Sequence, residues 1–241
     1  MKYLLVLSMF LFTFLISTMT QAQSRQEIID YRNLYESVVD EYGFDQVLVN
    51  GVIFEDIYQK KIGHQFFPED KLYTGSIMYR EKEYERIELK YDICNQQLIL
   101  FIKHNDLTVR TVPSNDFISS FSLGDKKFSK YNFQDAPRFY QVVYDTEKLK
   151  CLYHWSKQVR VTTNSGNLDY FRHKFTDSER KSYLGLNQSF EKFTNNRSFI
   201  DLFPQETKVQ VRQFIKTNHI KVAKSSDQKI TELLTYCNSL L

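Results

Sequence analysis

The chain has 241 residues, with 32 basic and 29 acidic side chains and a formal net charge of +3. This charge is too small and too evenly spread to indicate a nucleic-acid-binding protein, so no nucleic-acid partner is expected. Only 7 glycines and 4 prolines occur, which argues against low-complexity linkers and disordered tails.

The first residues have the pattern of a cleavable secretory signal peptide. Lys2 gives a positive start, Tyr3–Ile16 is apolar apart from two hydroxyl side chains, and small polar residues follow. Thr20 and Ala22 satisfy the small-residue rule, which predicts cleavage after Ala22. The apolar run is shorter than the roughly 20 residues that span a bilayer, and no later run is long enough. We therefore expect an exported protein, soluble after loss of 1–22 and without a transmembrane span.

A helix is predicted over residues 24–42. Apolar and tyrosine side chains recur there at helical spacing, Ser24 suits the N-cap, and Gly43 is a natural stop. Because the apolar stripe is rich in tyrosine, we expect this helix to lie on the sheet that follows.

From 46 to about 159 the apolar pattern changes to the period of a strand. Asn50-Gly51 between two apolar runs predicts a tight hairpin. Apolar and charged side chains alternate at 84–91, which is typical of an antiparallel sheet with one face in water. The regular spacing predicts an antiparallel meander or a curled, open, barrel-like sheet. Strands are expected at 47–49, 52–54, 71–79, 84–91, 97–103, 107–112, 117–122, 127–131, 139–144 and 149–155, with weaker ones at 168–174 and 182–190.

The end of the chain is predicted to be helical. Pro204 suits the first position of a helix that runs to about Thr217. Ser225 and Gln228 have the spacing of a capping box, and an apolar stripe follows. The predicted fold class is α+β and mainly β, with an N-terminal helix, the antiparallel sheet and two C-terminal helices. The expected parts are the signal peptide 1–22, a helix with an antiparallel β domain over 23–190, and a helical segment packed on the sheet over 191–241.

The three cysteines, Cys94, Cys151 and Cys237, have two interpretations. An exported protein meets an oxidising compartment, which would allow a Cys94–Cys151 disulfide. Each cysteine also lies on a local apolar face, where a thiol serves as a small core side chain. Both interpretations stay open at this stage.

The sequence carries no local catalytic or metal-binding motif. The glycine-rich phosphate loop, G-x-S-x-G, C-x-x-C and H-E-x-x-H are all missing, and the five histidines are not paired at metal-ligand spacings. No catalytic residue, cofactor or metal is therefore predicted. An active site built from distant segments would use side chains such as Asp92, Cys94 and His104.

A pattern of aromatic residues, turns and apolar runs is recognisable at 48–54, 63–67, 75–79, 84–92, 139–145 and 209–236. In this pattern the chain resembles a family of exported Bacteroidetes-type proteins with no assigned function. The resemblance implies the periplasm or cell surface of a two-membrane bacterium and no catalytic residue. The chain departs from the family pattern at Arg80-Glu81-Lys82, where a glycine-containing turn is usual.

Three functional hypotheses follow. The favoured one is a non-enzymatic periplasmic or cell-envelope module that binds a protein or another envelope component, with exposed edge strands that recruit the partner. The second is a carrier that encloses a lipid or small hydrophobic ligand in a cavity of the sheet. The third is an enzyme with a non-local site.

Overall fold

The computed structural model describes residues 51–58, 60–104, 107–163, 171–187 and 189–241. The chain divides into two units, Met1–Val47 with Lys103–Leu107, and Leu48–Ile102 with Thr108–Leu241. The core and the candidate site described below belong to the second unit. The predicted signal peptide, the helix at 24–42 and the strand at 47–49 lie outside the described residues. No helix in the described ranges is long and apolar enough to cross a membrane.

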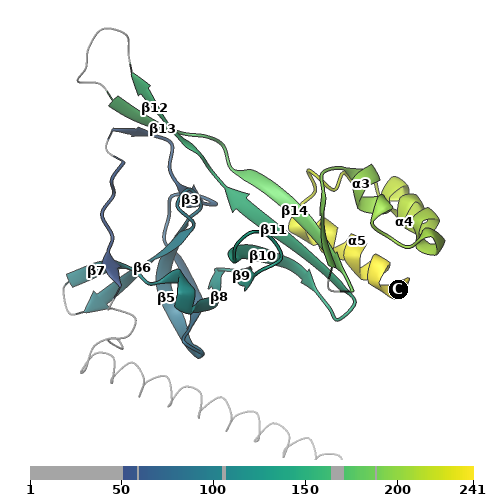
Figure 1. Ribbon diagram of the computed structural model, residues 1–241, viewed down its shortest axis with the longest axis horizontal. Helices are drawn as coiled ribbons and strands as arrows, with labels where there is room; N and C mark the ends of the chain where they lie inside the picture. Colours follow the sequence, from purple (N-terminus) through teal and green to yellow (C-terminus); the bar gives the residue numbers. More distant parts are fainter. Residues whose placement is uncertain (1–50, 59, 105–106, 164–170, 188) are drawn as a thin grey trace, which may run out of the picture. The chain divides into compact units, whose positions relative to one another are not determined.

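A large antiparallel sheet forms the body of the second unit (Figure 1). Its strands follow one another mostly in chain order, and the prediction of a mainly β fold with a large antiparallel sheet is confirmed. In spatial order they are β1 (Val52–Ile53), β7 (Leu107–Val112), β6 (Gln97–His104), β5 (Lys82–Asp92), β4 (Tyr73–Tyr79), β8 (Ile118–Leu123), β9 (Lys126–Tyr131), β10 (Arg138–Asp145), β11 (Leu149–Ser156), β14 (Glu179–Leu186) and β15 (Ser189–Phe193), and β3 (Phe66–Phe67) pairs with β5.

A second, three-stranded sheet contains β12 (Val159–Thr163), β13 (Phe171–Phe175) and β2 (Lys61–Ile62). β11 runs on into β12 and β13 runs on into β14, so one long hairpin contributes to both sheets (Figure 1). The backbone N–H of Lys157, at the bend of this hairpin, donates to the carbonyl of Ile93 at 3.2 Å. This bond ties the bend to the end of β5.

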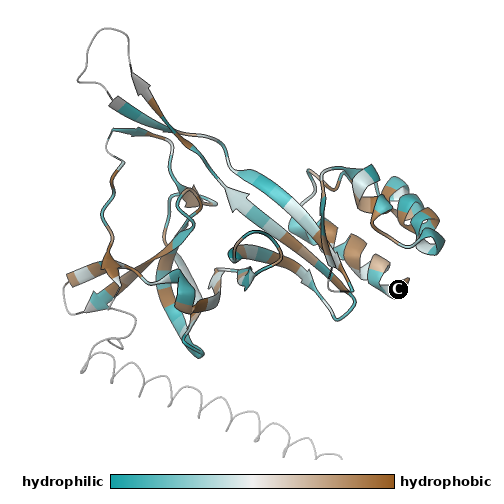
Figure 2. Cartoon of the chain, in the orientation of Figure 1, coloured by the Kyte–Doolittle hydropathy of each residue, from teal (hydrophilic) through white to brown (hydrophobic). Residues whose placement is uncertain are grey.

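Three helices lie in the described C-terminal part: α3 (Asn196–Asp201), α4 (Gln205–Thr217) and α5 (Asp227–Ser239). They share a hydrophobic core with strands β11, β14 and β15, as the brown inner turns of α5 in Figure 2 suggest. Polar contacts add to this packing, because Asp227 at the start of α5 accepts hydrogen bonds from Lys126 at 2.8 Å and Gln141 at 2.6 Å. The buried side chains at this interface include Leu149, Cys151, Leu184, Phe193, Phe199, Val211, Ile230, Leu234 and Cys237.

Several predicted boundaries need correction. The segment 182–190 is not one strand, because the chain turns at Asn187, whose φ is 49°, and separates β14 from β15. α5 is capped by Ser226 rather than Ser225, since the Ser226 side chain accepts the N–H of Lys229. Pro204 is the N-cap residue of α4 and not its first helical residue. The strands β2, β3 and β12 and the short helix α3 were not predicted.

Candidate functional site

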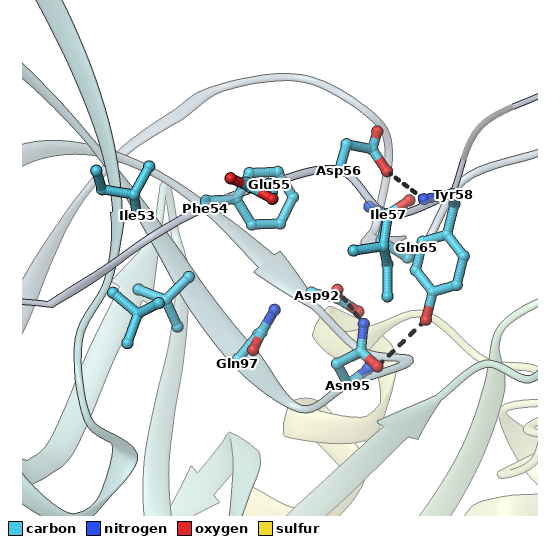
Figure 3. A pocket seen from close by; sticks show the side chains of 12 residues that line it. Ile53, Phe54, Glu55, Asp56, Ile57, Tyr58, Gln65, Asp92, Asn95 and Gln97 are labelled. Carbon is cyan, nitrogen blue, oxygen red and sulfur yellow. Dashed lines mark hydrogen bonds between the residues drawn. The ribbon is translucent and has the colours of Figure 1, made fainter.

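A pocket of about 810 Å³ lies beside the first described segment of the chain (Figure 3). We call Val52–Tyr58 the edge segment and this cavity the β1–β5 pocket, because its walls come from the edge segment, from β7 and from the end of β5. Its apolar lining consists of Val52, Ile53, Phe54, Ile57 and Val112, and its polar lining consists of Glu55, Asp56, Tyr58, Gln65, Asp92, Asn95 and Gln97.

The edge segment links the two sheets. Val52 and Ile53 pair with Val112 and Thr111 of β7, and the N–H of Phe54 donates to the carbonyl of Arg110 at 2.9 Å. Beyond Tyr58 the chain reaches β2, which pairs with β13 (Figure 1). The turn before β1 requires glycine, because a Cβ on Gly51 would lie 2.5 Å from the carbonyl oxygen of Val112.

Gln65 provides the most unusual polar group of the pocket. The residue is 0% exposed, and neither the nitrogen nor the oxygen of its side-chain amide has a hydrogen-bond partner in the described residues. Its backbone carbonyl accepts the N–H of Ile93 at 3.0 Å, which fixes the residue against the end of β5. A buried polar group without a partner costs about 1–3 kcal/mol, so an amide with two such atoms is a strong indication of a ligand site.

Asp92 is buried next to this amide and organises the turn between β5 and β6. Its Oδ1 accepts the N–H groups of Cys94 and Asn95, each at 2.9 Å, and its Oδ2 accepts the side-chain amide of Asn95 at 2.8 Å. Burial raises the pKa of Asp92 and outweighs these hydrogen bonds, which lower it. Tyr58 donates from its hydroxyl to Asn95 at 3.3 Å, so the turn also holds the end of the edge segment (Figure 3).

The rim of the pocket is acidic. Burial raises the pKa of Asp56, but the hydrogen bonds from Lys61 and from the N–H of Tyr58 outweigh it and lower the pKa. Glu55 is exposed and has no ion-pair or hydrogen-bond partner among the described residues. One carboxylate at the rim is therefore free to meet a basic group, because the other is already paired with Lys61.

The residues on both sides of Gln65 are fixed by Lys157. Its ammonium group donates to the carbonyls of His64 at 2.8 Å and Phe66 at 3.3 Å, while Nδ1 of His64 accepts the N–H of Phe66 at 3.2 Å. Burial, followed by repulsion from Lys157, lowers the pKa of His64. Burial also lowers the pKa of Lys157. This arrangement orders the backbone that presents the Gln65 amide to the pocket.

The structure brings together two of the side chains named for a non-local active site. Cys94 follows Asp92 in the same turn, and its half-buried thiol has a pKa that burial raises. The side chain of His104 lies outside the described part. No group of three or more histidine, cysteine or acidic side chains in the described residues is placed to hold a metal ion.

All three cysteines are free thiols in the structure, so the Cys94–Cys151 disulfide that the sequence leaves open as one of two interpretations is not present there. Cys94 lies in the β5–β6 turn, whereas Cys151 and Cys237 are fully buried in the core between the sheet and the helices. For the latter two, burial raises the thiol pKa to about 12. The positions of Cys151 and Cys237 fit the interpretation of small core side chains.

Sequence reasoning did not find Gln65, Asn95 or Gln97. The only signal at Gln65 is an amide directly before the Phe66-Phe67 pair, and burial of that amide depends on β5 and the edge segment. Comparison of the chain with protein-family models, curated proteins and solved structures finds no match. The function must therefore be inferred from the chemistry of the β1–β5 pocket.

Proposed function

We propose that the chain is an exported, non-enzymatic binding module of the cell envelope and that it holds its ligand in the β1–β5 pocket. The observation that carries this proposal is the side chain of Gln65, which is fully buried, lines the pocket and has no partner among the described residues for its donor or its acceptor. Native proteins rarely leave such groups unsatisfied, and a ligand with complementary groups would remove the penalty.

The polar groups of the pocket favour binding over nucleophilic catalysis. The carboxylate of Asp92 is occupied by three hydrogen bonds within its own turn. Burial raises the pKa of the Cys94 thiol, which keeps it protonated near neutral pH and weakens it as a nucleophile. Asp92 therefore shapes the pocket that it lines, and neither Asp92 nor the nearby Cys94 is well suited to attack a substrate.

The chemistry of Gln65 points to an amide ligand. A carboxamide offers one acceptor and one donor side by side, and the matching group presents a donor next to an acceptor, as a peptide unit does. The apolar side chains of Phe54 and Ile57 line the same pocket and suit an aliphatic part of the ligand.

The carrier hypothesis has less support from the described residues. It relied on the many aromatic side chains of the sheet, and these pack against one another as an ordinary core. The rings of Phe121 and Phe128 stack with centroids 4.8 Å apart, and Tyr91 meets both rings edge-on. Three residues that line the β1–β5 pocket, Glu55, Asp56 and Asp92, also carry carboxyl groups, which are costly to cover with a lipid chain.

The proposal can be tested with two small probes of nearly the same shape, N-methylacetamide and methyl acetate. In a nuclear magnetic resonance titration, N-methylacetamide should shift the side-chain amide signals of Gln65 in a saturable way. Methyl acetate lacks the N–H donor and should shift them far less. Gln141 is a matched internal control, because its buried side-chain amide is already bonded to Trp155 and Asp227.

Three results would contradict the proposal: no shift at Gln65 with either probe, equal shifts with both probes, or equal shifts at Gln65 and Gln141. Asn95 lines the same pocket and keeps its side-chain amide in a Gln65→Leu variant, which removes both polar atoms of Gln65. Any saturable shift that N-methylacetamide causes at Asn95 in the wild-type protein should be lost in this variant.

A further inference from the structure

We propose that the ligand of the β1–β5 pocket is an extended peptide segment of a partner protein that adds as a strand to the free edge of β1, with a basic residue opposite Glu55. This inference rests on the proposed function and names the class of ligand. It depends on the backbone of the edge segment, on the side chains along it and on the amide of Gln65.

Among the described residues, the backbone of the edge segment presents a strand edge without a partner, because β1 is the last strand of the main sheet on this side. Phe54 donates its N–H to β7 through Arg110, and Ile53 lies opposite Thr111. Hydrogen-bonded and non-bonded pairs alternate in an antiparallel ladder, so the N–H and C=O groups of Ile53 point away from β7. Continuing the same alternation past Phe54, we infer the same orientation for Glu55.

These outward groups have no hydrogen-bond partner among the described residues. Ile53 and Glu55 therefore offer two donor–acceptor pairs at the spacing that an added strand requires.

The side chains along this edge are those of a binding surface. Val52, Ile53 and Ile57 are 76%, 71% and 69% exposed, although the segment is strongly apolar (Figure 2). Free edges usually carry lysine or proline, which prevent unwanted strand pairing, and neither residue occurs between Val52 and Tyr58. The edge is therefore open to pairing with another strand.

The charge along the edge specifies the partner. The charged side chains of the edge segment are Glu55 and Asp56, and Asp56 is already bonded to Lys61 at 2.6 Å. Opposite charges that face each other across two strands stabilise the pair, and like charges destabilise it. We therefore expect a lysine or arginine opposite Glu55 and an aliphatic residue, two positions away, opposite Ile53.

The pocket adds a third contact beside the strand edge. Ile53, Glu55 and Gln65 line the same cavity, so a peptide paired with the edge segment lies next to the Gln65 amide (Figure 3). A peptide unit or an amide side chain of that segment can satisfy both atoms of Gln65. One extended peptide thus accounts for the free edge, the exposed apolar side chains, the unpaired acid and the buried amide.

The test is selection of binders from a phage-displayed library of random dodecapeptides against the folded protein. Selected peptides should share a lysine or arginine two positions from an aliphatic residue. They should lose affinity when the backbone nitrogens that pair with the edge are methylated. Ile53→Pro removes an outward N–H and should weaken binding by about tenfold or more, whereas Ile53→Ala keeps the N–H and should weaken it less.

Charge variants provide matched controls. Glu55→Lys should weaken the binding of the basic peptides by about tenfold. Glu69→Lys, at an exposed acid that pairs with Lys71 outside the pocket, should leave binding unchanged. If Ile53→Pro does not fold, N-methylated peptides titrated against the wild-type protein test the same hydrogen bonds.

The outcomes separate this inference from the proposed function. Selected peptides that depend on Gln65 but bind Ile53→Pro with unchanged affinity would overturn strand addition and leave the pocket as the binding site. If the phage library yields no binding peptide while Gln65 responds normally to N-methylacetamide, the proposal of a peptide ligand is overturned and the proposed binding pocket is not. Failure of both experiments would overturn both proposals. Concentration-dependent dimers lost in Ile53→Pro would show that a second copy of the chain, and not a partner, occupies the edge.

Discussion

The backbone carbonyl of Gln65 accepts the N–H of Ile93 at 3.0 Å, and the buried side chains of Gln65 and Asp92 line the same pocket. The two side chains belong to segments almost thirty residues apart, joined through β3 and β5. The carboxylate of Asp92 accepts three hydrogen bonds within its own turn, whereas the side-chain amide of Gln65 has no partner among the described residues. This contrast indicates that Asp92 builds the pocket wall, and it supports the proposal that a ligand pairs with Gln65.

Two buried glutamines should respond to the same substitution in opposite ways. Gln65→Leu removes an unsatisfied donor and acceptor, so the free energy of unfolding should stay constant or rise by up to about 2 kcal/mol. Gln141→Leu leaves Trp155 Nε1 without its acceptor and removes a donor to Asp227, so stability should fall by about 2–3 kcal/mol.

Urea denaturation of both variants measures this difference. A large loss of stability in Gln65→Leu would mean that its amide has partners in the folded protein and would weaken the case for the site. A gain in stability with loss of the amide response would identify Gln65 as a residue kept for binding at the expense of stability.

Acid should destabilise the protein through His64 and His154. Burial is the main cause that lowers the pKa of each below the usual 6.5. Lys157 and Lys61 also lower the pKa of His64, while Asp70 opposes them. As the pH falls through 6.5 the unfolded chain binds protons that the native protein does not, so the free energy of unfolding decreases. The loss continues until the pH passes the lower native pKa values.

The contribution of His64 can be isolated by denaturation between about pH 8 and about pH 5, the range in which histidines titrate. In His64→Gln the free energy of unfolding should decrease less as the pH is lowered, because glutamine keeps an acceptor near the N–H of Phe66 and cannot become charged. His219→Gln, at an exposed histidine, should retain the wild-type decline. An unchanged pH profile in His64→Gln would rule out His64 as a source of acid sensitivity.

Thiol labelling should distinguish the two interpretations of the cysteines. In the native protein a disulfide-exchange reagent should modify Cys94 alone, because Cys151 and Cys237 are 0% exposed and their thiol pKa values are raised to about 12. After unfolding in urea all three thiols should react. If a Cys94–Cys151 disulfide forms on export, native protein should give no reactive thiol and unfolded protein only that of Cys237.

The sequence predicted the strands with a clear alternation and missed the elements that depend on distant partners. β5 was found because apolar and charged side chains alternate at 84–91, and β6 because its continuous apolar run at 98–102 indicates a strand buried on both faces. β2 is only two residues long and shows no period, so its pairing with β13 had no signal in the sequence.

The candidate site could not be predicted from the sequence for the same reason. Gln65 is a polar residue between His64 and Phe66, and nothing local shows that it is buried. Its burial follows from tertiary contacts of β3 with β5, on which the sequence pattern is silent. Asp92 and Cys94 were named from their place at a strand end, and that place does put them together in one turn.

The turn between β4 and β5 should be stabilised by glycine. Arg80 and Glu81 form a two-residue hairpin loop, and both have positive φ, 49° and 66°. Non-glycine residues are strained in this conformation by about 1–2 kcal/mol each, and tight hairpins therefore favour glycine. Arg80 has compensating contacts, since its N–H donates to the carbonyl of Phe117 and its guanidinium lies 4.3 Å from the Phe117 ring. Glu81 is exposed.

We therefore expect Glu81→Gly to raise the free energy of unfolding by about 1 kcal/mol. The matched control is Glu83→Gly, at an exposed position inside β5, where glycine relieves no strain and should lower stability by about 0.5–1 kcal/mol. Urea denaturation measures both changes. A loss of stability in Glu81→Gly equal to that in Glu83→Gly would contradict this prediction. It would show that the left-handed conformation at Glu81 carries no strain and that this hairpin loop gains nothing from glycine.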